Sequence, residues 1–274
     1  MGPATSTLRS GQRALKIAST WAANPSGPGT CGSLTVPPSL PTRRQPGRFG
    51  ANVRFRRRLP SRFPTIYGES DPAMSPSPDI LARFFAKPGH PLLVIAGPCV
   101  LEDEATNLAI GRAARDAAAA AGLAFMFKAS FDKANRSSAR SLRGPGPKDG
   151  LARLADLRET LGVPVTSDVH APEQCEAAAG VLDMLQIPAF LCRQTDLLTA
   201  AARTGRPVNV KKGQFMSPAE MRNVVEKLRT GGCPHVMVTE RGTTFGYHRL
   251  VNDFIGIGDL LDQGSPVCFD VTHS

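Results

Sequence analysis

The sequence predicts an α/β fold, a (β/α)8 TIM barrel of which seven strands are present, preceded by a disordered leader. From residue 91 onward, short apolar runs alternate with helical stretches and begin about 20 to 40 residues apart, as in strand–helix units of a parallel sheet. Polar and reactive side chains follow each run. In a barrel the loops after the strands form one mouth, whereas a doubly wound open sheet, the alternative, gathers ligands at a switch point. The presence of reactive side chains after every strand favours the barrel.

Residues 1–73 are predicted to be a disordered, basic leader rich in Pro, Gly and Ser. They hold ten of the 24 prolines and eleven Arg and Lys against Glu69 and Asp71, which gives a net charge of +9 out of the total of +10. This composition matches a transit peptide, or a stretch included because the start was placed too early, with Met74 as the alternative start. We favour the second interpretation, because Pro and Gly disrupt the amphipathic helix that import needs. A nucleic-acid-binding tail through RFRRR is the least favoured.

Residues 74–274 are predicted to form the barrel domain. Seven strands are expected within it: Leu92–Ile95, Leu123–Phe127, Val163–Thr166, Met184–Ile187, Pro207–Val210, His235–Thr239 and Pro266–Asp270. Five helices are clearest between them: Ala105–Ala121, Gly150–Leu161, Pro172–Ala179, Asp196–Thr204 and Pro218–Thr230. Ser217 is expected to cap the last of these helices, with Pro218 at the first helical position and Glu220 completing a capping box.

The predicted barrel lacks one strand. Residues 91–274 number 184, whereas a barrel of this kind averages about 250 residues. The seventh strand is followed by only a few residues, so we expect the first and seventh strands to be unpaired edges. The sequence is then a fragment or a wrongly terminated reading frame.

Composition narrows the class of protein further. The 201 residues after the leader carry 22 basic and 21 acidic groups, so the barrel has no nucleic-acid footprint. The six cysteines form no CxxC pair, which indicates reduced thiols and a cytoplasmic protein. No apolar run approaches the roughly 20 residues of a membrane helix. We therefore expect neither nucleic acid nor membrane as a partner.

The segment Phe127–Ser138, FKASFDKANRSS, combines two lysines, an arginine, an asparagine and three serines directly after an apolar run. A loop that leaves a buried strand can direct several donors at one ligand. Lysine supplies a point charge and arginine a planar fork, which together suit phosphate or carboxylate. A solvated basic loop is the alternative interpretation of this segment taken alone.

Six motifs in order carry a family resemblance: IAGPC, KASFDKANRSS, LQIPAFLCRQTDL, VNVKKGQF, TERGTTFGY and FDVTHS. On these motifs, residues 92–274 resemble 3-deoxy-D-manno-octulosonate 8-phosphate synthase, also called 2-dehydro-3-deoxyphosphooctonate aldolase. The resemblance implies a transferase that condenses phosphoenolpyruvate with D-arabinose 5-phosphate and water for lipopolysaccharide core biosynthesis. Related synthases that use erythrose 4-phosphate are less similar, since their counterpart of KANRSS usually reads KPRTS. An inactive fragment of the enzyme is a further alternative.

The resemblance also implies site residues. The phosphoenolpyruvate site falls on Lys128, Ser130, Lys133, Gln186, Lys211 and Arg241, and the arabinose 5-phosphate site on Asn135, Arg136, Ser137 and Arg193. Catalytic roles fall on Lys133, Asn135, Asp168, His170 and His273. Arg193 is supplied across a subunit interface in the family, which implies a homotetramer. Lys212 has no assignment, and it remains open whether Asp168 and His170 act directly or only bond each other.

A divalent metal ion is implied by Cys99. Family members with cysteine at this position bind a metal, and members with asparagine work without one. Cys99 and His273 match two of the ligands, and a glutamate and an aspartate are expected beyond residue 274. A thiolate with an imidazole suits Zn²⁺ or Fe²⁺, with Mn²⁺ as a further option. Because two ligands hold an ion poorly, we expect weak or no specific metal binding by these 274 residues.

Overall fold

The computed structural model describes residues 15–21, 79–86, 92–134, 138, 140 and 142–274. For residues 15–21 it describes only the backbone. The chain divides into two units, residues 1–23 with 74–274 and residues 24–73, and the second unit lies outside the described residues. The boundary of the leader at residue 73, and its predicted disorder outside residues 15–21, therefore remain predictions.

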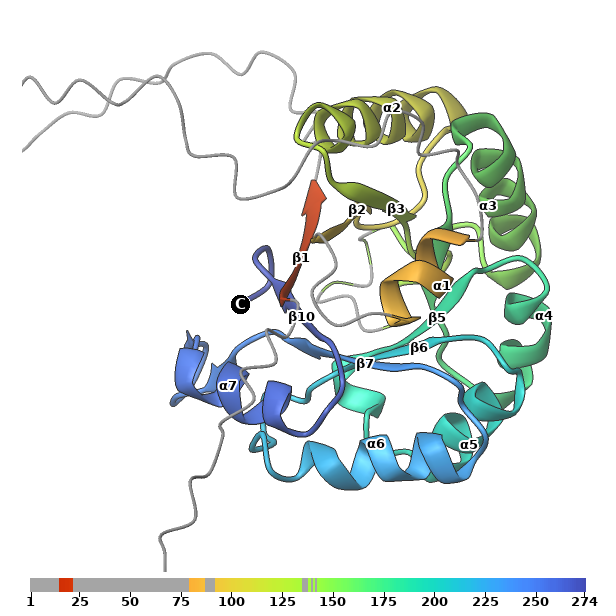
Figure 1. Ribbon diagram of the computed structural model, residues 1–274. Coiled ribbons are helices and arrows are strands. Elements are labelled where there is room, and N and C mark those ends of the chain that lie inside the picture. The colour runs from red at the N-terminus through yellow and green to blue at the C-terminus, as the bar shows by residue number, and fades with distance from the viewer. Residues whose placement is uncertain (1–14, 22–78, 87–91, 135–137, 139, 141) are drawn as a thin grey trace, which may run out of the picture. The chain divides into compact units, whose positions relative to one another are not determined.

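Seven parallel strands with helices between them form the barrel wall, as the sequence predicted (Figure 1). They are β2 (Leu93–Pro98), β3 (Ala124–Lys128), β4 (Val165–Asp168), β5 (Met184–Ile187), β6 (Val208–Lys211), β7 (Val236–Glu240) and β10 (Val267–Asp270). Six of them have both limits within two residues of the predicted runs, and β2 ends three residues after its predicted end at Ile95. The order around the ring follows the sequence, so each strand end contributes to the same mouth.

One further strand corrects the prediction of two unpaired edges. β1 (Leu15–Trp21) pairs in parallel with β10, from Leu15 opposite Val267, and with β2, from Ile17 opposite Val94. It occupies the place between β2 and β10 in the ring (Figure 1). An open strand edge leaves backbone N–H and C=O groups unpaired, and LKIASTW contains the β-branched and aromatic residues that suit strands. The prediction failed here because the composition of the whole leader masked this short run.

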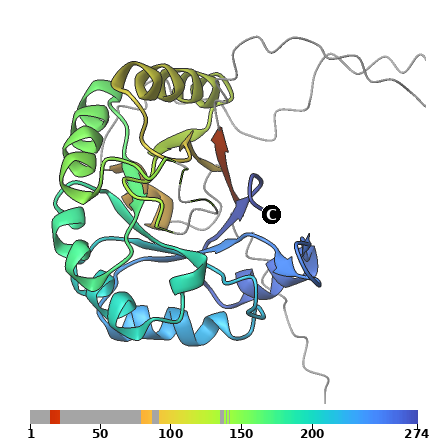
Figure 2. The same ribbon diagram turned by 180° about the vertical axis from the view of Figure 1, so that it is seen from behind.

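Helices surround the strands on the outside (Figures 1 and 2). They are α2 (Glu104–Ala120), α3 (Pro147–Leu161), α4 (Cys175–Ala179), α5 (Thr195–Arg203), α6 (Met221–Thr230) and α7 (Phe254–Asp262), with short 3-10 turns η1 (Pro172–Gln174) and η2 (Ala189–Leu191). Their apolar faces pack with outward strand residues such as Leu185, Val210 and Val238 in the larger core. None of the described helices is long and apolar enough to span a membrane.

Besides β1, two helices and one hairpin were not predicted, and two helices start away from their predicted first residues. α3 begins three residues before the predicted start at Gly150. α1 (Asp79–Ala86), α7 and the hairpin of β8 (Thr243–Thr244) with β9 (Leu250–Val251) have no counterpart among the expected elements. The predicted capping box forms, since the Ser217 amide donates to Glu220 at 2.8 Å and the Glu220 amide donates to the Ser217 hydroxyl at 3.3 Å. Regular α6 nevertheless begins only at Met221, after a tighter turn.

Helix α1 closes the interior of the barrel at the amino-terminal ends of the strands. Leu81 and Phe84 are buried in a second apolar cluster. Its other members are inward residues of the strands, namely Leu93, Ile95, Ala124, Met126, Met184, Met237 and Cys268. The floor of the barrel is therefore apolar, and polar chemistry is confined to the opposite end.

Replacing Phe84 by alanine is expected to lower the free energy of unfolding by about 3 kcal/mol, because a large side chain is removed from a closed cluster. Phe245→Ala is the matched control, since Phe245 is 71% exposed, and should change it by less than about 0.5 kcal/mol. Urea unfolding followed by circular dichroism measures both. Equal effects of the two substitutions would show that α1 does not close the barrel floor.

Candidate functional site

The barrel interior changes from apolar to polar along the strands. Side chains alternate along a strand, so Gln186 lies on the same face as Met184, and Thr239 on the same face as Met237. Neighbouring strands place their polar residues at one level, because Asp168 is paired with Gln186 and Gln186 with Asn209. The carboxyl ends of β3 to β7 thus build a buried polar layer above the apolar floor.

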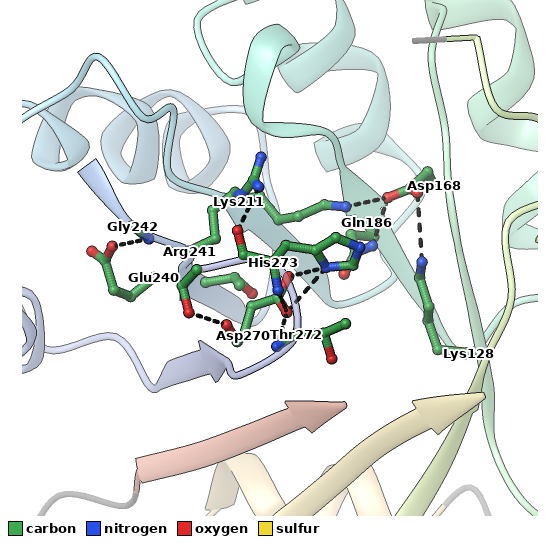
Figure 3. A network of polar contacts seen from close by, with 12 residues as sticks. Lys128, Asp168, Gln186, Lys211, Glu240, Arg241, Gly242, Asp270, Thr272 and His273 are labelled. Carbon is green, nitrogen blue, oxygen red and sulfur yellow. Dashed lines mark hydrogen bonds and ion pairs between the residues drawn. The ribbon is translucent and has the colours of Figure 1, made fainter. Parts of the chain in front are cut away.

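Asp168, at the end of β4, is the centre of this layer (Figure 3). Its Oδ1 lies 3.1 Å from Lys211 Nζ and accepts a hydrogen bond of 2.5 Å from Gln186 Nε2. Its Oδ2 lies 3.8 Å from Lys128 Nζ and accepts from the Ser130 hydroxyl at 2.7 Å. One carboxylate therefore holds two lysines from different strands at the same mouth.

The orientation of the Gln186 amide is fixed from its other side. Asn209 Nδ2 donates to Gln186 Oε1 at 3.1 Å, and the Thr239 hydroxyl donates to Asn209 Oδ1 at 2.7 Å. This chain of bonds runs across β5, β6 and β7 and is buried. Asn209 and Thr239 were missed by sequence reasoning. The sequence marks them only by their spacing along short strands. Asn209 lies two residues before Lys211, and Thr239 lies two residues after Met237, so each shares a face of its strand with that residue.

The charged groups in this polar layer shift one another's pKa. Burial alone would raise the pKa of Asp168, but Lys211, Lys128 and Lys133 outweigh it and hold that pKa well below its usual value. Burial, reinforced by Lys133, lowers the pKa of Lys128 to about 8, against the opposing effect of Asp168. Asp168 is therefore an anion, and Lys128 is a cation that loses its proton unusually easily.

A second group of residues lies where β7 and β10 end (Figure 3). His273 Nδ1 lies 2.9 Å from Asp270 Oδ2, and this contact is the main cause of its raised pKa. The hydrogen bond from His273 lowers the pKa of Cys99 to about 6, and Lys133 adds to the effect. Arg241 Nη2 donates to the His273 carbonyl at 2.9 Å. The loops after β2, β3, β7 and β10 thus meet.

These contacts decide which predicted residues lie together. One polar group contains the predicted residues Lys128, Ser130, Lys133, Asp168, Gln186 and Lys211. Lys133 joins this group to Cys99 and His273. Arg241 reaches the same group through His273. Arg193 is exposed after η2 and has no part in these contacts. Asn135, Arg136 and Ser137 lie outside the described residues.

The sequence left open whether His170 and Asp168 form a hydrogen bond with each other. In the structure they do not. The Nδ1 atom of His170 is buried and has no hydrogen-bond partner in the part of the chain that the structure describes. Burial lowers its pKa. The imidazole packs edge-on against Phe131, with ring centroids 6.2 Å apart. It is a half-buried neutral ring with a free nitrogen beside the polar layer.

The donor set for a metal ion is incomplete among the described residues. Cys99 and His273 are brought together as the resemblance implies. Asp270, however, bonds His273 Nδ1, and no group of three or more His, Cys, Asp or Glu side chains that could hold a metal is found in the described ranges. A thiolate and an imidazole still match the donor preference of Zn²⁺ or Fe²⁺.

Comparison with known proteins identifies relatives of this architecture. Residues 80–274 match the DAHP synthetase I family. The 2-dehydro-3-deoxyphosphooctonate aldolase of Desulfatibacillum aliphaticivorans is 55% identical over 186 residues, which cover 68% of each chain. The enzyme of the same name from Nitratidesulfovibrio vulgaris (strain DP4) is 54% identical over 200 residues, covering 73% of this chain and 72% of the relative. That from Geobacter sp. (strain M21) is 53% identical over 186 residues, again 68% of each.

Proposed function

The chain belongs to the DAHP synthetase I family, and we propose that its reaction is that of a 2-dehydro-3-deoxyphosphooctonate aldolase, the name its relatives carry. In this reaction phosphoenolpyruvate condenses with D-arabinose 5-phosphate and water to give 3-deoxy-D-manno-octulosonate 8-phosphate and phosphate, for lipopolysaccharide core biosynthesis. The observation that supports it most is the convergence of Lys128, Lys133 and Lys211 on Asp168 at one barrel mouth. Relatives named for the octonate favour arabinose 5-phosphate over erythrose 4-phosphate.

Phosphoenolpyruvate bears a phosphate and a carboxylate, so its site requires several cations. The three lysines exceed the single charge of Asp168 in their group, and Arg241 adds a further guanidinium close by. The Arg241 Nε atom is buried without a hydrogen-bond partner among the described residues, which leaves a donor for a ligand oxygen. We assign phosphoenolpyruvate to these four cations. Ser130 and Gln186, which bond Asp168, position the lysines.

The sugar phosphate is assigned to Asn135, Arg136 and Ser137, which follow Lys133 closely in the sequence. An arginine beside two short polar side chains suits a phosphate by its planar fork. The exposed position of Arg193 is compatible with a role across a subunit interface in a homotetramer. A cytoplasmic location is part of the proposal, and the free state of the five described cysteines supports it.

The lysine group performs two tasks in the condensation. It neutralises the phosphate and carboxylate of phosphoenolpyruvate, and it holds C3 of this substrate toward the sugar aldehyde. Asp168 holds the ammonium groups of Lys128 and Lys211 in place during this step. The unpaired Nδ1 of His170 is available to bond a substrate hydroxyl or water at the rim of the layer.

A divalent ion remains part of the proposal, with Cys99 and His273 as the residues of this chain that would hold it. When bound, the ion supplies a Lewis acid that orients or activates water near C2 of phosphoenolpyruvate. Asp270 fixes the His273 ring by its Nδ1 atom, so that Nε2 is the nitrogen available to a ligand.

Metal analysis of the purified 274-residue protein is expected to give well under one equivalent of zinc or iron, because the described residues assemble only two of the proposed ligands. Plasma emission spectrometry after dialysis, with and without a chelator, measures this content. A stoichiometric content that the chelator removes and added metal restores would contradict the expectation.

The affinity for phosphoenolpyruvate is expected to fall as the pH rises through about 8, where Lys128 loses its proton. Below that pH Lys128 is a cation and attracts the ligand; above it the attraction is lost. Calorimetric titration between pH 7 and 9.5 should show about a tenfold weaker binding at the upper end, which is of the order of one charged hydrogen bond. Lys128→Arg keeps its charge throughout this range and should remove the dependence. Persistence of the dependence in that variant would assign it to another group.

The proposed function is tested by phosphate release from phosphoenolpyruvate in the presence of arabinose 5-phosphate and an excess of a divalent metal ion, because the chain alone is expected to retain little metal. Erythrose 4-phosphate is the control acceptor. We expect release with the five-carbon acceptor and at least about tenfold less with the four-carbon one, since lost contacts to a substrate reduce turnover. Release that prefers erythrose 4-phosphate would overturn the choice of acceptor. Absence of both release and phosphoenolpyruvate binding would overturn the function.

A further inference from the structure

Lys211 and Lys212 are adjacent at the end of β6 but point in opposite directions. Successive side chains on a strand face opposite sides, and Lys211 faces the barrel interior, where it pairs with Asp168. Lys212 therefore turns outward, beneath the loops that follow β6 and β7. Its side chain is 0% exposed, so it is not a solvated cation, and its outward direction separates it from the substrate group.

The ammonium group of Lys212 is surrounded by oxygen atoms from two loops. It lies 3.4 Å from the carbonyl of Gly242, which follows β7, and 3.1 Å from Oγ1 of Thr243, the first residue of β8. It lies 3.3 Å from the Met216 carbonyl in the loop after β6. Its counter-ion is Glu240, whose Oε1 is 3.5 Å away and whose side chain is 2% exposed. Lys212 thus ties the two loops together from beneath.

The residue enclosed by these contacts is Arg241. Glu240 precedes it, and Gly242 follows it with a φ of +88°, a conformation that favours glycine. The Gly242 amide donates to Glu240 Oε1 at 2.7 Å, which closes a tight turn around Arg241 (Figure 3). Glu240 turns toward this amide, while Arg241 extends toward the His273 carbonyl. Of the two sequence neighbours of Arg241, Glu240 belongs to the Lys212–Glu240 pair, and Gly242 is bonded by both of its members.

We propose that the buried Lys212–Glu240 pair positions Arg241, so that its guanidinium is presented to the phosphoenolpyruvate site. The inference rests on the proposed function in naming the ligand. Neither Lys212 nor Glu240 contacts substrate, and both act through Arg241.

A role in stability alone does not account for this pair. Burying two charges costs solvation, and well-packed apolar residues of similar volume often replace such pairs with no loss of stability. An apolar pair, however, could not accept the Gly242 amide or donate to carbonyl groups of both loops. What the charges add is a fixed backbone at Arg241.

The test uses two variants of the full chain. Lys212→Met removes the cation and leaves Glu240 buried without it, so it is expected to lower the melting temperature. Lys212→Met combined with Glu240→Gln removes both charges, while the glutamine oxygen can still accept from Gly242, and is expected to restore much of the melting temperature. Lys148→Met, at an exposed lysine on α3, is the matched control.

Two measurements follow in each variant. Amide hydrogen exchange without ligand should be at least about tenfold faster at Gly242 and Thr243 in the double variant than in the parent, because local order rather than global stability is lost. Calorimetric titration with phosphoenolpyruvate should show about tenfold weaker binding in the same variant, as small misplacements of a binding group have large effects. The Lys148→Met control should match the parent in both.

The outcomes separate this inference from the proposed function. Parent-like exchange at Gly242 and Thr243 in the double variant would overturn the positioning role, whatever the ligand. Faster exchange with unchanged phosphoenolpyruvate affinity would overturn the link between the pair and the site. If the parent itself does not bind phosphoenolpyruvate, the proposed function fails, and the exchange result still decides whether the pair orders the segment around Arg241.

Discussion

Replacing Asp168 by alanine is expected to lower the free energy of unfolding by about 3–5 kcal/mol, because it leaves buried cations without their counter-charge. Lys128 is 4% exposed and Lys211 lies nearby with its ammonium 3.1 Å from the carboxylate. The same substitution removes the acceptor of the Ser130 and Gln186 side chains. Affinity for phosphoenolpyruvate should also fall, since the lysines lose their fixed positions. Urea unfolding and ligand titration measure the two effects.

Asp168→Asn separates charge from shape in this experiment. The amide can still accept from Ser130 or Gln186 but offers no negative charge to Lys128 and Lys211. We expect it to recover part of the stability and little of the affinity. Asp259→Ala, at an exposed position on α7, is the control and should change the free energy of unfolding by less than about 0.5 kcal/mol. A loss of under about 1 kcal/mol in Asp168→Ala would show that Asp168 is not the centre of the layer.

Replacing Lys211 by methionine is expected to lower kcat/KM for phosphoenolpyruvate by about 100- to 1000-fold, the usual effect of losing one charged group from such a site. Stability should change little, because the Lys211 side chain is 17% exposed and Asp168 keeps Lys128, Ser130 and Gln186 as partners. Steady-state kinetics and thermal unfolding of Lys211→Met and the control Lys148→Met give both quantities. A kcat/KM within about threefold of the parent would remove Lys211 from the site.

Much of the fold could be predicted because each strand of the barrel is a local signal. Met184–Ile187, for example, is an apolar run of strand length, and its observed limits equal the predicted ones. β1 and α1 could not be found in this way, because their place depends on partners far away in the sequence. Leu15–Trp21 becomes a strand by pairing with β2 and β10, and Leu81 and Phe84 are buried by strand residues that only the closed barrel brings together.

Residues of the candidate site could be predicted where they belong to a sequence motif. They could not be predicted where only the packing of the folded barrel determines their position. Lys128 and Lys211 follow apolar runs, so their place at the mouth could be inferred from sequence. Lys212 stands beside Lys211 with the same chemistry, and only the alternation of a strand of known limits shows that it is buried on the other face. Asn209 carries no motif, and its role appears only once Gln186 and Thr239 are seen on either side of it.

The central claim is that Lys128 and Lys211 bind one phosphoenolpyruvate molecule at the barrel mouth. A double-mutant cycle on phosphoenolpyruvate binding tests it most directly. Calorimetric titration would compare the parent with Lys128→Met, Lys211→Met and the double variant. If both lysines hold one ligand, each single substitution weakens binding at least about tenfold, and the effects couple by about 0.5 kcal/mol or more. Unchanged affinity in either single variant, or strictly additive effects, would contradict a common site.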